Sequence, residues 1–184
     1  MARPATAPNY AAVSQLELAG KRVEFLRKTF PNARHIGLLW DATSREQADA
    51  AAAVAGQLGF EPRLLEVIGQ PPNYAAALMP MEQWPAEPIM IPASPLALRD
   101  RATIVRLMLD RRTPSICAFR EVMEAGALFS YGVNLVDVFR DVAAVVDQVA
   151  RLGNAGEIPM RGPSHFHTAV NLKTAKSLDR KSVV

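Results

Sequence analysis

The stretch HIGLLWDATSREQADAAAAVAGQLG, residues 35–59, decides the fold class. It opens with the apolar run His35–Trp40, which is typical of a buried strand. Ser44 and Gln47 stand three residues apart, which fits a capping box, and an alanine-rich helix follows to about Leu58. A buried strand that leads directly into a helix predicts one unit of an α/β fold.

The same alternation continues on both sides of this unit. Further short apolar runs predict strands at 62–68, 88–92, 115–119, 127–131 and 165–170. Helical spacing of apolar residues predicts helices at 15–30, 73–79, 95–112, 121–125 and 135–152, with a final short one after Asn171. Strands separated by helices predict a mostly parallel sheet with helices on both faces. In the first helix we expect the basic residues on the more polar face: Lys21, Arg22, Arg27 and Lys28.

Composition excludes several classes of protein. The chain has 184 residues, of which 49% are hydrophobic and 21% charged, so it can form a buried core and fits a single domain. Lys plus Arg number 21 against 18 for Asp plus Glu, and a net charge of +3 is too small to predict nucleic-acid binding. The single cysteine excludes an intramolecular disulfide. No apolar run is long enough to predict a membrane-spanning helix.

Polar residues follow three of the predicted strands. In parallel sheets, ligands bind at the carboxyl ends of the strands, so these exits hold the candidate ligand-binding residues. Both serines also fit helix caps, and capping alone would explain them. We place the candidate site at Asp41, Ser44, Ser94, Phe119, Arg120 and Glu121.

No pattern in the sequence predicts catalysis, a cofactor or a metal. The loop after the first strand lacks the glycines that a dinucleotide or phosphate site needs. Ser130 has no G-x-S-x-G motif around it, and Cys117 lies inside an apolar run, where a buried thiol is the simpler interpretation. We therefore expect no catalytic residue, no cofactor and no metal ligand.

Three strings, in this order, resemble the substrate-binding proteins of ABC transporters, in the group that takes aromatic amino acids and related small solutes. Leu18–Arg22 (LAGKR) precedes the first predicted strand, Phe119–Gly132 contains FRE followed by EAGALFSYG, and Asn171–Lys176 (NLKTAK) stands near the end. The resemblance covers about residues 15–177. It implies a periplasmic-binding-protein type I-like fold, of which this sequence matches the C-terminal lobe only.

The resemblance also implies a function. Two lobes close on a small amino-acid-like solute, which the protein delivers to ABC permease subunits without chemistry. It implies a periplasmic or other extracytoplasmic location, although the first residues, MARPATAPNYAAVSQ, contain no apolar stretch of a secretory signal.

The resemblance divides the chain into three parts. Residues 1–14 are expected to form an extended lead-in, since they contain Pro4 and Pro8. Residues 15–133 form the C-terminal-lobe-like domain. Residues 134–184 form a hinge and return segment that in the family packs on an N-terminal lobe, which this sequence does not contain.

Two other functions stay open. The helix after Asn134 would expose an apolar stripe of Leu135, Phe139 and Val142, so the chain could be a degenerate lobe that acts only as a dimerisation or interaction module. The third possibility is a small flavodoxin-like α/β enzyme.

Overall fold

The computed structural model describes residues 10–84, 86–152 and 166–178. Its strands are β1 (His35–Trp40), β2 (Glu61–Glu66), β3 (Ile89–Met90), β4 (Ser115–Cys117), β5 (Phe129–Val133) and β6 (Phe166–Val170). Its α-helices are α1 (Tyr10–Thr29), α2 (Arg45–Gln57), α3 (Tyr74–Leu78), α4 (Pro95–Arg99), α5 (Arg101–Asp110), α6 (Arg120–Glu124), α7 (Leu135–Leu152) and α8 (Leu172–Ser177). A short 3-10 helix, η1 (Met79–Met81), follows α3.

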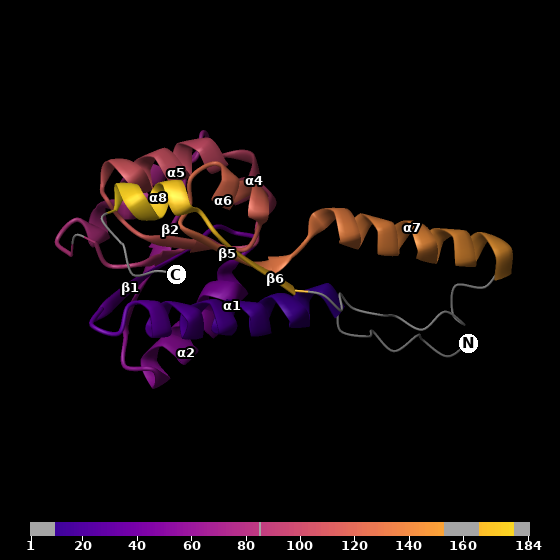
Figure 1. The fold of residues 1–184 in the computed structure, drawn as a ribbon, viewed down its shortest axis with the longest axis horizontal. Helices are drawn as coiled ribbons and strands as arrows, with labels where there is room; N and C mark the ends of the chain where they lie inside the picture. Colours follow the sequence, from indigo (N-terminus) through magenta and orange to yellow (C-terminus); the bar gives the residue numbers. More distant parts are fainter. Residues whose placement is uncertain (1–9, 85, 153–165, 179–184) are drawn as a thin grey trace.

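The strands form one sheet in the order β2-β1-β3-β4-β5-β6. The first five strands are parallel, and β6 pairs antiparallel with β5 along its whole length. Figure 1 shows α1 and α2 on one side of the sheet and α4, α5 and α6 on the other. The predicted fold class, a mostly parallel sheet with helices on both faces, is confirmed.

Each face of the sheet has its own apolar core. The first core joins α1 and α2 to the sheet, and its centre consists of fully buried side chains: Val23, Leu26, Ile36, Leu38, Ala51, Met90 and Ile116. The second core lies under α3, α4, α5 and α6 and includes Leu39, Leu65, Leu78, Ile89, Ile91, Ile104 and Cys117. Alternate residues of β1 point to opposite cores, because successive side chains of a strand face opposite sides of the sheet.

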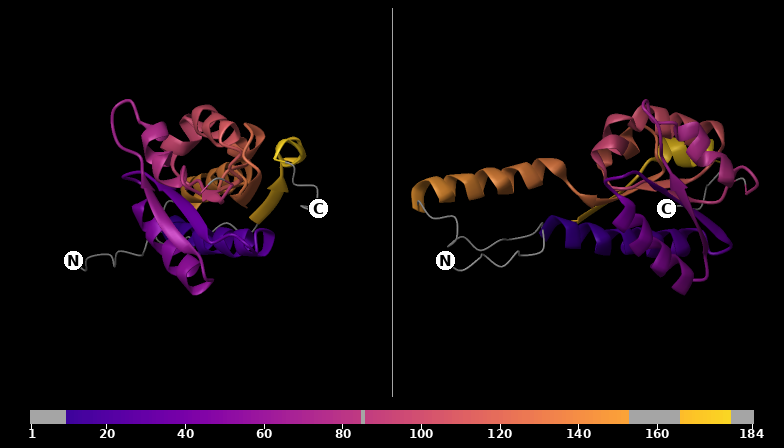
Figure 2. Two further views of the ribbon diagram at one scale, coloured as in Figure 1. Left: turned by 90° about the vertical axis from the view of Figure 1, so that its left-hand side faces the viewer. Right: turned by 180° about the vertical axis from the view of Figure 1, so that it is seen from behind.

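The helix α7 leaves this body at the carboxyl end of β5. Figures 1 and 2 show it extending away from the sheet, on the side where the first half of α1 also lies. Five large apolar side chains of α7 are exposed: Val136, Phe139, Val142, Val145 and Val146. The described part of the chain therefore leaves one face of this helix without apolar cover.

Residues 134–184 were expected to form a hinge and return segment that packs on an N-terminal lobe. The structure instead returns β6 and α8 to this lobe, where β6 pairs with β5. The side chains of Asn171 and Thr174 donate hydrogen bonds to the carbonyls of Met123 and Gly126, at 2.9 Å each. Within the described part of this segment, α7 is the element that extends away from the lobe (Figure 1).

Three sequence expectations need correction at the level of elements. Arg22 was placed on the polar face of the first helix, but its exposed fraction is 0%, because α1 packs that face against the sheet. The helix expected over 95–112 divides at Asp100 into α4 and α5. Residues 10–14, expected in the extended lead-in, belong to α1, which begins at Tyr10; residues 1–9 lie outside the described residues.

Candidate functional site

The candidate residues lie on three loops at one edge of the sheet. Because β1, β3 and β4 are parallel neighbours, their carboxyl ends meet at this edge. The first loop joins β1 to α2, the second joins β3 to α4, and the third joins β4 to α6. The fold thus brings Asp41 and Ser44, Ser94, and Phe119–Glu121 to the same edge.

The first loop is closed by its own hydrogen bonds. The Ser44 hydroxyl accepts from the Asp41 backbone N–H at 2.9 Å. The Asp41 carboxylate accepts from the backbone N–H and the hydroxyl of Thr43, at 2.8 Å and 2.6 Å. Both Asp41 and Ser44 are buried. The predicted capping box is therefore wrong, because the Ser44 hydroxyl binds the preceding loop and makes no hydrogen bond to the first turn of α2.

Gln47 connects the first loop to the second. Its side-chain amide donates to the Ala93 carbonyl at 2.9 Å, and its carbonyl oxygen accepts from the Ala93 backbone N–H at 3.0 Å. This two-bond clamp holds the start of α2 against the exit of β3. In the sequence, the signal for this clamp was Gln47 itself, a polar residue in the first turn of the helix, which we assigned to a capping box instead.

Ser94 caps α4 as predicted. Its hydroxyl accepts from the Ala97 backbone N–H at 2.9 Å, and the side chain is buried. Burial would raise the pKa of Asp41, but hydrogen bonds from Ser94, Thr43 and Ser44 outweigh burial and hold that pKa below its usual value. Asp41 is therefore a charged loop anchor at neutral pH.

The third loop offers more accessible side chains. Phe119 and Glu121 are half-buried, and Arg120 is exposed with its Nε donating to Glu124 at 2.7 Å. Glu121 lines an open hollow of about 560 Å³ together with Arg99, Arg101, Ala102, Glu124 and Ala125. In this loop, unlike the first two, the candidate side chains are accessible to solvent.

A second polar group near this edge was missed by sequence reasoning. The Tyr74 hydroxyl donates to Asp100 at 2.8 Å, and Arg99 donates two hydrogen bonds of 2.7 Å to the same carboxylate. Burial and the bond to Asp100 raise the pKa of Tyr74. The pKa of Asp100 is lowered, and the hydrogen bond from Arg99 is the largest cause. Nothing in the spacing of Tyr74, Arg99 and Asp100 signals this contact, because it joins different helices.

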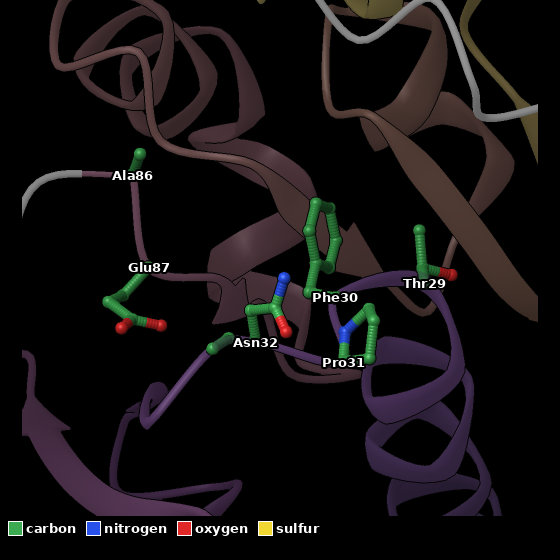
Figure 3. A pocket seen from close by; sticks show the side chains of 7 residues that line it. Thr29, Phe30, Pro31, Asn32, Ala86 and Glu87 are labelled. Carbon is green, nitrogen blue, oxygen red and sulfur yellow. The ribbon is translucent and has the colours of Figure 1, made fainter.

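A separate pocket of about 230 Å³ lies at the other end of the sheet (Figure 3). Figure 3 labels Phe30, Pro31 and Asn32 on one side of it and Ala86 and Glu87 on the other. This pocket adjoins the start of β1 and contains none of the predicted ligand-binding residues. The candidate site and this pocket are therefore distinct.

Two kinds of reactive group are relevant to the described residues, a metal site and a thiolate. The described residues contain no group of three His, Cys, Asp or Glu side chains that could hold a metal ion. Burial raises the pKa of the Cys117 thiol to about 12, so it is not a thiolate at neutral pH. Within 10–84, 86–152 and 166–178, no helix is long and apolar enough to cross a membrane.

Solved structures share this fold. A structure described as the ABC domain in complex with L-Trp from Streptococcus pneumonia has a TM-score of 0.78 and 21% identity, covering 88% of this chain. A conserved domain protein from Vibrio cholerae o1 biovar eltor str. n16961 has a TM-score of 0.79 and 15% identity, again over 88% of this chain. The ligand-free, open structure of CD0873 from Clostridium difficile, a substrate binding protein with adhesive properties, has a TM-score of 0.64 and 18% identity over 87% of this chain.

The chain spans 57%, 55% and 55% of the lengths of these three proteins. At such identities the likeness shows the fold alone. A search of curated proteins found no match. The family model for ABC transporter substrate binding proteins, however, matches residues 3–181, which is nearly the whole sequence. The chain therefore belongs to the ABC transporter substrate binding protein family.

Proposed function

We propose that this chain is a solute-binding component of an ABC import system and that it binds a small amino-acid-like molecule without chemistry. The observation that carries the proposal is the family match over residues 3–181. It follows that the chain acts outside the cytoplasm and delivers its solute to permease subunits. The site residues are those of the three loops at the carboxyl edge.

The third loop suits an amino-acid-like solute. A zwitterion needs one group of each charge, and the consecutive residues Arg120 and Glu121 supply them at the start of α6. The half-buried Phe119 ring adds an apolar contact. We assign Asp41, Ser44 and Ser94 an indirect part: they are buried and shape the loops on which the solute rests.

One structural neighbour supports the class of solute. The Streptococcus pneumonia structure is a complex with L-Trp, and its fold covers 88% of this chain. The chain spans 57% of that protein, and a solute held by the three loops alone would be contacted on one side, so we expect weak binding by residues 1–184.

Isothermal titration calorimetry with L-tryptophan and a panel of other amino acids tests this proposal. We expect saturable heat at millimolar ligand for at least one of them. Arg120→Gln and Glu121→Gln should each weaken that binding about tenfold, because each removes a charge-assisted hydrogen bond. Arg106→Gln is the matched control, since Arg106 is exposed on α5 and does not line the hollow beside Glu121. No heat with any amino acid would refute the proposed solute class.

The exposed stripe of α7 favours a second function, a homodimerisation module. Leu135, Phe139, Val142, Val146 and Val149 follow a four-three spacing, which places them along one face of the helix. Phe139 is 70% exposed, and burying such a ring against a second copy would remove it from water.

Sedimentation velocity over a range of concentrations tests this module. We expect a dimer for the wild-type chain and a monomer for Phe139→Asp. Ala144→Asp is the matched control, because residue 144 lies on the opposite face of α7 and should leave the dimer intact. A monomeric wild-type chain at all concentrations would refute the module.

A further inference from the structure

Arg22 is a buried cation in the interior of the lobe. It lies on α1, and its exposed fraction is 0%. A charged side chain is almost never buried to this extent without a partner of opposite charge, because removing the charge from water is costly. The contacts of Arg22 therefore show whether a partner within the lobe compensates for burying its charge.

One side of the buried guanidinium has a short hydrogen bond, and the other side does not. Arg22 Nε donates to the Tyr131 carbonyl at 2.8 Å. Nη2 reaches the Gln15 side-chain oxygen at 3.4 Å, which is long for a hydrogen bond. Nη1 is buried and has no hydrogen-bond partner among the described residues. The edge formed by Nη1 and Nη2 thus holds one long bond where a carboxylate could accept two short ones.

The described chain supplies no negative charge to Arg22. None of the ion pairs among residues 10–84, 86–152 and 166–178 includes it. Cys117 is an acidic group close enough to affect Arg22, but its own pKa is about 12, so the thiol is neutral. Burial lowers the pKa of Arg22 to about 10, which still leaves it charged at neutral pH.

The position of Arg22 connects it to the candidate site. Nη2 lies 3.5 Å from where a side chain on Gly132 would begin, and that position also meets the Ala118 carbonyl. Ala118 directly precedes Phe119 at the exit of β4. The free guanidinium edge therefore lies beside the strand ends from which the third loop leaves.

We propose that the Nη1–Nη2 edge of Arg22 is a receptor for a carboxylate group, and that the solute of this chain is an organic acid or a zwitterion that supplies it. In this proposal Gln15 is the cover of the receptor: its side chain is half-buried, and its long bond to Nη2 is separate from the bond between Nε and Tyr131. The planar fork fits two carboxylate oxygens at once, which a lysine could not do. The claim that the solute supplies the carboxylate rests on the proposed solute-binding function. The claim that Arg22 can receive a carboxylate is independent of that function.

Thermal unfolding in sodium acetate against sodium chloride at equal ionic strength tests the receptor without any solute. We expect acetate to raise the Tm of the wild-type chain by about 2–4 °C at concentrations well above its dissociation constant. Arg22→Met should lose this increase, and Lys21→Met should keep it, because Lys21 is an exposed cation one residue away. An equal response of all three chains to acetate, or none in the wild type, would overturn the proposal.

A second variant keeps the test decisive if Arg22→Met does not fold. Gln15→Ala removes the cover and keeps the guanidinium, so it should bind acetate more tightly than the wild-type chain and show a larger increase in Tm. A Gln15→Ala chain that responds to acetate no more than to chloride would also overturn the receptor.

Calorimetry with two matched probes then identifies the source of the carboxylate. L-tryptophan carries a carboxylate and tryptamine lacks it, so the wild-type chain should bind L-tryptophan at least tenfold more tightly, and Arg22→Met should remove most of the difference. Equal binding of both probes would leave the solute-binding function standing and refute the role of Arg22 in it. An acetate response without binding of any amino acid would support the receptor and refute the proposed solute class.

Discussion

The first two loops at the carboxyl edge and the helix α7 are built in opposite ways. In these loops, polar side chains turn inward: Asp41, Ser44 and Ser94 are buried and hydrogen-bonded to nearby backbone or side chains. In α7, apolar side chains turn outward, and the charged ones pair within the helix, as Arg140 does with Asp137 at 3.0 Å.

This difference separates the residues that stabilise the lobe from those that are free to contact another molecule. Both faces of the sheet are already covered by helices, so the two cores are complete without α7. The buried polar groups of the first two loops have hydrogen-bond partners, whereas the apolar stripe of α7 has no cover among the described residues. We therefore expect mutations in the lobe to change its stability and mutations on α7 to change association.

The largest effect should come from the core. Ile116→Ala, on the central strand β4, is expected to lower the free energy of unfolding by about 2–5 kcal/mol, because it leaves a cavity at a fully buried position. Val142→Ala on α7 should change it by about 0.5 kcal/mol or less when the chain is monomeric, since Val142 is exposed. Urea unfolding at low protein concentration measures both. Equal losses would mean that α7 is part of the same folded core.

A smaller effect is expected at Asp41, and it should depend on pH. Asp41→Asn removes the negative charge and one of the two acceptor oxygens, which weakens the hydrogen bonds that favour the charged form, and should cost about 1.5–3 kcal/mol at pH 7. The pKa of Asp41 is lower in the folded state, so its contribution is complete above the unfolded value of about 3.9 and disappears as the pH falls through the folded pKa. Unfolding of both chains between pH 7 and pH 3 should show the difference shrinking; a difference independent of pH would exclude a charged anchor.

Gln47 tests whether the first two loops act as one unit. Gln47→Ala removes both hydrogen bonds to Ala93 and should destabilise the lobe by about 1–2 kcal/mol. Gln57→Ala is the matched control on the same helix, because Gln57 is exposed at its end. Denaturant unfolding compares the two. Identical free energies of unfolding for these two variants would show that the clamp does not stabilise the lobe.

The smallest effect belongs to the surface of α7. Arg151→Ala breaks the exposed pair with Asp147, whose atoms lie 3.0 Å apart, and should cost about 0.3–0.5 kcal/mol of helix stability. Circular dichroism during thermal unfolding, at low and high salt, measures it. A loss that is large or unaffected by salt would place Arg151 in an interface.

Much of the fold could be predicted from local pattern. Ser94, Asn73 and Asn171 cap helices as expected, because a cap involves only residues within one turn. The strand starting at residue 115 was found from its apolar run, although the structure ends it at Cys117. The strand expected at 127–131 lies two residues later, at Phe129–Val133, because pairing with β4 and β6 sets its bounds.

The site was less predictable. Local spacing suggested a capping box for Ser44 and Gln47, but Asp41 and Ala93 offered better partners. The candidate residues Asp41, Ser44, Ser94, Phe119, Arg120 and Glu121 lie at one edge of the sheet, yet three are buried and three are accessible. Their part in ligand binding stays a prediction.

The sequence alone determined the order of strands and helices along the chain, the caps at Asn73, Ser94 and Asn171, and the apolar stripe of α7, since these depend on residues a few positions apart. Only the tertiary structure decided that Arg22 is buried beside Tyr131, because that contact joins residues 109 positions apart. Periodicity shows that a helix has a polar face; it cannot show that a neighbouring strand will cover part of that face. Burial of a charge is a property of the assembled sheet and helices, and so is the unfilled edge of the Arg22 guanidinium.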